Sequence, residues 1–111
     1  MATINPKSFL RRLFPTSHRL LLIRKIIPLI KNLNGKILVL GAGYWPTKDQ
    51  FNKNSSVIFS DIDTNYPQVS IFANAHNLPF KDETFSGILA LEVFEHLENP
   101  NVASDEILRV L

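Results

Sequence analysis

The chain contains no cysteine, and this absence excludes two kinds of construction. Its 111 residues can hold neither a disulfide framework nor a thiolate metal site, which fits a reducing compartment. Long apolar runs are also missing: the longest stretch, residues 20–30, is interrupted by Arg24 and Lys25 and is too short to span a bilayer. The basic start is followed by neither an uncharged apolar region nor a small-residue cleavage site. We therefore expect a cytoplasmic protein without a signal peptide.

Acidic residues are scarce in the first half of the chain. Residues 1–53 contain ten Lys or Arg and a single acid. Residues 54–111 contain two Lys or Arg and nine acids. Such asymmetry suggests an anionic partner, such as a membrane surface contacted peripherally, an acidic substrate or nucleic acid, although a solvated helix face would look the same. We predict no nucleic-acid partner. The positive side chains concerned are Arg11, Arg12, Arg19, Arg24 and Lys25.

Short apolar runs, rather than long ones, are what the sequence contains. Residues 37–40 are all apolar without alternation, which is typical of a strand buried on both faces. Similar runs occupy residues 57–59, 69–72 and 87–91, and each ends at a polar or small residue. Alternation of such strands with helices predicts an α/β fold with a Rossmann-like parallel sheet, incomplete at about four strands.

Helical segments are expected between and around these strands. The pattern predicts a helix from about residue 18 to 27, kinked or ended by Pro28, and a short helix over residues 46–53. Residues 101–111 form another, capped by Asn99 or Asn101. Its apolar side would carry Val102, Ile107, Leu108 and Leu111. The link between residues 61 and 69 is too short for a crossover helix and is expected to be a compact loop.

We interpret residues 1–34 as a basic N-terminal arm and helix. Residues 35–111 are then a partial cofactor-binding domain, truncated at its C-terminus.

Glycines occur where the first buried strand ends, in the sequence Gly41-Ala42-Gly43. Glycine there allows a tight turn and a close approach of a ligand to the main chain. Asp61 ends the next run, 20 residues after Gly41, a spacing typical of an acid that accepts hydrogen bonds from a ribose. The combination predicts a nucleoside site at the carboxyl edge of the sheet.

Position 46 bears on which nucleoside would bind. A dinucleotide fingerprint needs a third small residue there and a helix N-terminus that faces the pyrophosphate. Pro46 offers no N–H to a phosphate, which counts against NAD but not against a cofactor without phosphates.

Several further segments carry a family resemblance. Read together, ILVLGAG, SDID, ANAHNLPFKDETFSGILALEVFEHLENP and EILRVL resemble class I (Rossmann-like) S-adenosylmethionine-dependent methyltransferases over about residues 36–111. The resemblance implies that Gly41, Ala42 and Gly43 face the methionine part of S-adenosyl-L-methionine. It implies that Asp61 holds the ribose hydroxyls.

The resemblance also implies an adenine side of the site. Asn74 and Ala75 would lie beside the base, and the same pocket would be completed by Ile62, His76 and Leu91. Two positions depart from the family pattern: Trp45 replaces a usual glycine, and Asn74 replaces a usual aspartate. An amide oxygen can still accept from the adenine amino group, so binding is expected, if weaker.

Other conspicuous residues have simpler interpretations. Leu78, Phe80 and Phe85 are expected to pack beneath the loop that carries Asn74. Glu92, Glu95 and His96 have too few companions to make a metal site, and we predict none. Tyr44 and Trp45 either cover the cofactor or belong to the core.

The sequence thus predicts the cofactor-binding half of a methyltransferase, acting on a small-molecule or lipid-like acceptor. Methyl transfer needs alignment more than acid–base chemistry, and orientation contributes roughly 7–11 kcal/mol, so no catalytic residue is nominated. The chain alone is expected to be incomplete and inactive. Two alternatives remain at this stage: a non-catalytic nucleoside-binding module, and an NAD-binding Rossmann protein.

Overall fold

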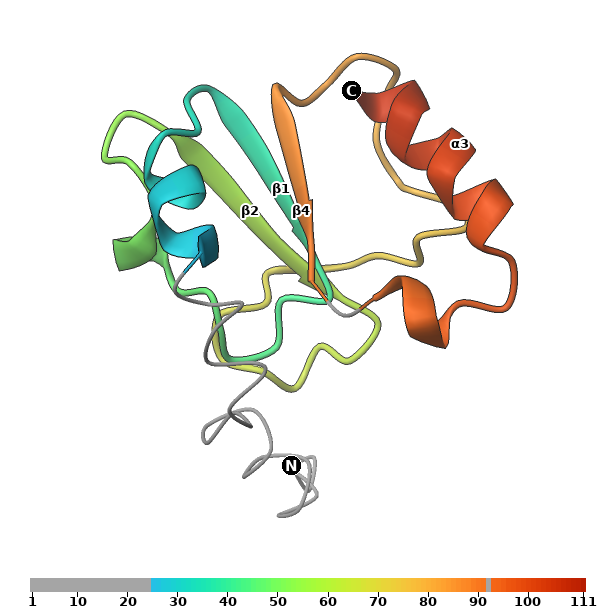
Figure 1. Ribbon diagram of the computed structural model, residues 1–111. Coiled ribbons are helices and arrows are strands. Elements are labelled where there is room, and N and C mark those ends of the chain that lie inside the picture. Colours follow the sequence, from blue (N-terminus) through green and yellow to red (C-terminus); the bar gives the residue numbers. More distant parts are fainter. Residues whose placement is uncertain (1–24, 92) are drawn as a thin grey trace.

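Four parallel strands form the centre of the molecule. The computed structural model describes residues 25–91 and 93–111. The strands lie side by side in the order β3-β2-β1-β4 (Figure 1), and every neighbouring pair is parallel. Their bounds are Lys36–Leu40 for β1, Ser56–Asp61 for β2, Ile71–Phe72 for β3 and Gly87–Ala90 for β4. This confirms the predicted Rossmann-like α/β fold with about four strands.

The central strand β1 is buried on both faces, as its unbroken apolar run predicts. Ile37, Leu38, Val39 and Leu40 are each at most 2% exposed. Leu38 and Leu40 face a cluster that includes residues of the last helix, whereas Ile37 and Val39 face a second cluster that includes Ile30. The sheet is therefore the middle layer between two separate cores.

Helical segments cover the two faces of the sheet. Figure 1 shows α3 (Pro100–Val110) on one side and the helix at residues 25–31 on the other. The second helix continues past Pro28, so of the two expected effects of this proline, a kink or an end, the end is wrong. Ile30 is fully buried against β1, and this packing favours a last turn beyond the proline. The expected start near residue 18 lies outside the described residues. None of the helices described is long and apolar enough to cross a membrane.

The connections between strands contain little helix. The predicted helix over residues 46–53 is reduced to one 3-10 turn, η1 (Lys48–Gln50), and a second such turn, η2 (Phe94–His96), follows β4. Residues 62–70 contain no helix, which confirms the expected compact loop.

The last helix begins as predicted but buries a different face. Asn99 is its N-cap, and its side chain accepts a hydrogen bond from the N–H of Val102. The buried positions are Ala103 and Val110, with Ile107 packed beside them. Leu108 is instead 69% exposed, so the predicted apolar side is wrong. The small side chain of Ala103 allows the helix to lie close to the sheet, and this contact determines its rotation.

The strand β4 is an open edge. It pairs with β1 on one side, and no strand of the described residues lies on its other side. Its sequence, GILA, contains neither the lysine nor the proline that commonly protects an edge. Ile88 and Leu89 are only half-buried.

We expect this edge to make the 111-residue chain self-associate, because unpaired backbone groups beside apolar side chains can pair with another copy. Sedimentation velocity over a range of concentrations should show growing oligomers. A monodisperse monomer with a sharp thermal transition would contradict the prediction.

Candidate functional site

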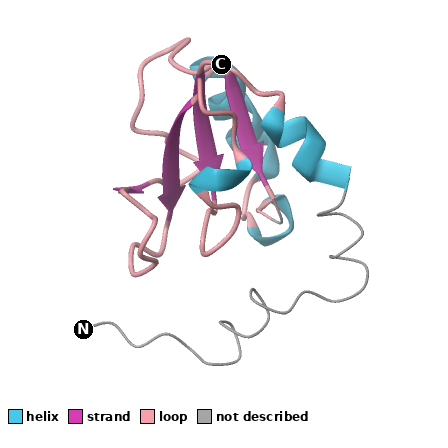
Figure 2. Ribbon diagram, turned by 90° about the vertical axis from the view of Figure 1, so that its left-hand side faces the viewer, coloured by secondary structure: helices cyan, strands magenta, loops and turns pink. Residues whose placement is uncertain are grey.

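The predicted site residues gather at one edge of the sheet. All strands are parallel, so their carboxyl ends point the same way, and Figure 2 shows the three longer strands pointing to one edge from which loops emerge. The glycine loop follows β1, Asp61 ends β2, Asn74 follows β3 by two residues, and Leu91 follows β4. Ligands of open α/β sheets bind at such an edge.

The glycine loop depends on both of its glycines. Gly41 and Gly43 have φ angles of +62° and +52°, in the region that favours glycine. A Cβ atom at Gly41 would also lie 2.6 Å from a methyl group of Val93. Between them, buried Ala42 donates its N–H to the carbonyl of Ser60, at 2.9 Å. The loop is thereby held against the end of β2.

Asp61 connects this loop to the neighbouring strand. The residue is only 5% exposed. Its Oδ2 accepts a hydrogen bond from the N–H of Gly43, and its Oδ1 accepts one from the N–H of Asp63, each at 3.0 Å. These two bonds hold the glycine loop and the start of the next loop to the end of β2.

A second side chain that holds the glycine loop was not found by sequence reasoning. Gln68 donates from Nε2 to the carbonyl oxygens of Gly43 and Pro46, at 2.9 and 3.0 Å. Gln68 lies in the loop after β2 and belongs to no motif. Only its place beside a loop 22 to 25 residues earlier in the chain gives it this role.

Apolar side chains flank Asp61 and follow β4. Ile62 is 69% exposed immediately after Asp61, and Leu91 is half-buried just after β4. Ala75 is buried. An exposed isoleucine beside a polar carboxylate fits a ligand with a flat apolar part and hydroxyl groups.

Asn74 lies near Asp61 through the pairing of β2 with β3. The carbonyl of Asp61 accepts from the N–H of Ala73, which directly precedes Asn74. The Asn74 side chain is exposed and bonded to His76, and His76 in turn is bonded to the backbone of Asn99 at the start of α3. These contacts join the end of β3 to the last helix.

The segment after Asn74 is fastened to α3 by an ion pair that sequence reasoning did not predict. Arg109 donates to the carbonyl oxygens of Leu78 and Phe80, at 3.0 and 2.8 Å. It also donates to both carboxylate oxygens of Glu106, at 2.8 and 2.9 Å. Glu106 accepts the N–H of Leu78, at 2.7 Å. We call Glu106 and Arg109, with these contacts, the α3 clamp.

Charge and hydrogen bonding shift the pKa values of both ionisable groups in the clamp. The hydrogen bond from Arg109, followed by that from the Leu78 N–H, lowers the pKa of Glu106. The hydrogen bond to Glu106, followed by that to Asp82, raises the pKa of Arg109. Both residues therefore stay charged at neutral pH.

The packing role expected for Leu78 and Phe85 agrees with their burial at 3% exposure each. The rings of Phe80 and Phe85 meet edge to face, with centroids 4.8 Å apart. The clamp and these rings together fix the loop that leads from Asn74 to β4.

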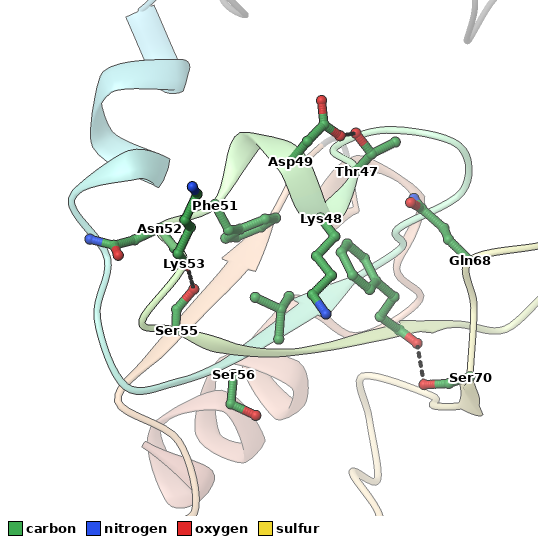
Figure 3. A pocket seen from close by; sticks show the side chains of 12 residues that line it. Thr47, Lys48, Asp49, Phe51, Asn52, Lys53, Ser55, Ser56, Gln68 and Ser70 are labelled. Carbon is green, nitrogen blue, oxygen red and sulfur yellow. Dashed lines mark hydrogen bonds between the residues drawn. The ribbon is translucent and has the colours of Figure 1, made fainter.

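A hollow lies beside β2 and η1, and its lining includes Gln68, which also holds the glycine loop (Figure 3). Phe51, Val57 and Phe59 contribute apolar surface, and Lys48 and Gln68 are among its polar residues. None of the predicted cofactor residues lines it. Across residues 25–91 and 93–111, no three His, Asp or Glu side chains are grouped to hold a metal ion.

Comparisons with known proteins bear on the family and the fold of the chain. A family model described as "Methyltransferase domain" matches residues 49–111. No curated protein matches the chain significantly. Among solved structures, the chain is similar to a protein of Methanococcus maripaludis that is assigned as an S-adenosyl-L-methionine-dependent methyltransferase. The TM-score is 0.62, the identity is 17%, and the match covers 80% of this chain and 49% of that one. The chain thus spans about half the length of that relative.

Proposed function

Because the chain belongs to the methyltransferase-domain family, we propose that it binds S-adenosyl-L-methionine at the carboxyl edge of its sheet. It would be the cofactor-binding part of an enzyme that transfers a methyl group. The observation that carries this proposal is the bond between Asp61 and the N–H of Gly43, which joins a buried acid to a glycine loop at the end of two adjacent strands.

The residues at this edge fit the cofactor. Gly41 and Gly43 give the loop after β1 its positive-φ turn, and the methionine part would lie against this loop. Asp61, a buried acid at the end of β2, would receive the ribose hydroxyls, and Ile62, exposed beside it, would cover the base. Asn74, Ala75, His76 and Leu91 would complete the base side. When bound, the cofactor supplies a methyl group on a positively charged sulfur; the protein orients it.

A dinucleotide fits this loop poorly. The N–H of Ala42 is used by Ser60, and that of Gly43 by Asp61, so neither is available to a pyrophosphate. Pro46 has no N–H, and η1 is too short to offer a helix N-terminus. These features favour a nucleoside without phosphates over the alternative of NAD.

We expect calorimetry on the full chain to show binding of S-adenosylhomocysteine and none of NAD. S-adenosylhomocysteine shares the nucleoside and amino-acid parts of the cofactor and lacks only the methyl group. A preference for NAD would refute the proposed function.

The place and partner of the protein belong to the same proposal. We propose a cytoplasmic protein, with peripheral membrane contact through its basic N-terminal segment, that acts on a small-molecule or lipid-like acceptor. The observation behind the proposed membrane contact is the excess of Lys and Arg in residues 1–53. Arg11, Arg12, Arg19 and Arg24 lie outside the described residues, and Lys25 is exposed.

A further inference from the structure

The amide of Asn74 is held in one orientation by its own chain. The backbone N–H of His76 lies 3.0 Å from the side-chain oxygen Oδ1 of Asn74. A backbone nitrogen can only donate, so the amide atom that faces it must be the oxygen. The backbone N–H of His76 therefore determines which end of the Asn74 amide is Oδ1 and which is Nδ2.

The imidazole of His76 uses the same oxygen. Its Nε2 lies 3.1 Å from the backbone N–H of Asn99 and must accept that hydrogen bond, so in neutral His76 the ring proton is on Nδ1. Nδ1 lies 2.8 Å from Oδ1 of Asn74 and therefore donates to it. Both lone pairs of the oxygen are then occupied.

What Asn74 presents to a ligand is consequently its NH₂ group. Asn74 is exposed, and none of residues 25–91 or 93–111 accepts a hydrogen bond from its Nδ2. An aspartate at this position would accept the hydrogen bonds from His76 with one carboxylate oxygen. Its second oxygen would be an acceptor for a ligand. Asparagine has a single oxygen and offers a donor instead.

We propose that Asn74 determines the base specificity of the site, so that a purine is recognised through an acceptor atom and its 6-amino group is not required. This rests on the proposed function. The 6-amino group of adenine is a donor and cannot bond to a second donor, whereas a ring nitrogen or a 6-oxo group can accept from Nδ2. The ligand class is a purine nucleoside thioether with either substituent at position 6.

The test compares two ligands that differ only at position 6, S-adenosylhomocysteine and S-inosylhomocysteine. Calorimetry on the full chain should show that the 6-oxo ligand binds as tightly as the 6-amino ligand, within about threefold, or more tightly. In Asn74→Asp the outward oxygen returns as a charged acceptor. The ratio of affinities should then shift toward the 6-amino ligand by about tenfold or more.

Asn77→Asp is the matched control, because it adds the same charge three residues away on an exposed residue whose backbone N–H bonds to the carbonyl of Asn74. Its ratio of affinities should equal that of the unmodified chain. The ratio also cancels any general effect of charge, because both ligands carry the same charge.

Each remaining outcome is decisive. A preference of the unmodified chain for the 6-amino ligand by more than about threefold overturns the inference without any variant. An unchanged ratio in folded Asn74→Asp, or an equal shift in Asn77→Asp, also overturns it. Failure of the folded chain to bind either ligand refutes the proposed function itself, which separates the two failures.

Discussion

Replacing Asp61 by alanine is expected to weaken the binding of S-adenosylhomocysteine at least about tenfold. Hydrogen bonds to a charged acceptor contribute about 1.5–3 kcal/mol, and the variant would lose those to the ribose hydroxyls. It would also leave the N–H of Gly43 without its acceptor, so the glycine loop would be less well held. Calorimetry on the variant measures the loss directly.

Two variants separate the binding role from general charge. Asp63→Ala removes the same charge two residues later, from an exposed side chain that accepts the N–H of Asn65, and should leave the affinity unchanged. Asp61→Asn keeps one acceptor oxygen and should show an intermediate loss. Full affinity in folded Asp61→Ala would mean that this residue serves only to anchor the loop.

Breaking the α3 clamp is expected to have the largest effect on stability. Arg109→Ala removes the donors to the carbonyls of Leu78 and Phe80 and leaves Glu106, only 19% exposed at its side chain, without its cation. We expect the melting temperature to fall by about 4–8 °C or more. The ion pair with Asp82 adds little, because that side chain is 76% exposed. Thermal unfolding followed by circular dichroism measures the change.

Geometry as well as charge should matter at this clamp. Arg109→Lys keeps the charge but not the planar fork that reaches both carbonyls and the carboxylate, so it should restore little of the loss. Lys81→Ala removes a positive charge from a nearby exposed position and should leave the melting temperature unchanged. Equal melting temperatures for Arg109→Ala and the unmodified chain would show that the clamp does not hold the loop.

The same clamp has a distinct dependence on pH. The pKa of Glu106 is lower in the folded chain, so its contribution is complete above the unfolded pKa and is lost as the pH falls through the folded pKa. The difference in melting temperature between the unmodified chain and Arg109→Ala should therefore narrow below about pH 4. A constant difference would mean that the carbonyl contacts, and not Glu106, account for the stability.

The sequence by itself determined those features that depend on neighbouring residues. The apolar run at residues 37–40 required a strand covered on both faces, and β1 is such a strand. Gly41, Gly43 and Asp61 were recognised because a tight turn and a strand-end acid recur at a regular spacing. Asn99 was among two candidate caps for the same local reason. Local preference and periodicity act within a few residues, so they can be read along the chain.

Only the tertiary structure decided the contacts between distant segments. The rotation of α3 depended on the fit of Ala103 against the sheet, so Leu108 is exposed although the helical pattern placed it inward. The clamp joins Arg109 to a carbonyl 31 residues earlier, and Gln68 reaches back 25 residues to Gly43. The tautomer of His76, which determines that its ring donates to Asn74, depends on the backbone N–H of Asn99, 23 residues later. Each depends on the partner that packing brings close, and no local pattern encodes that partner.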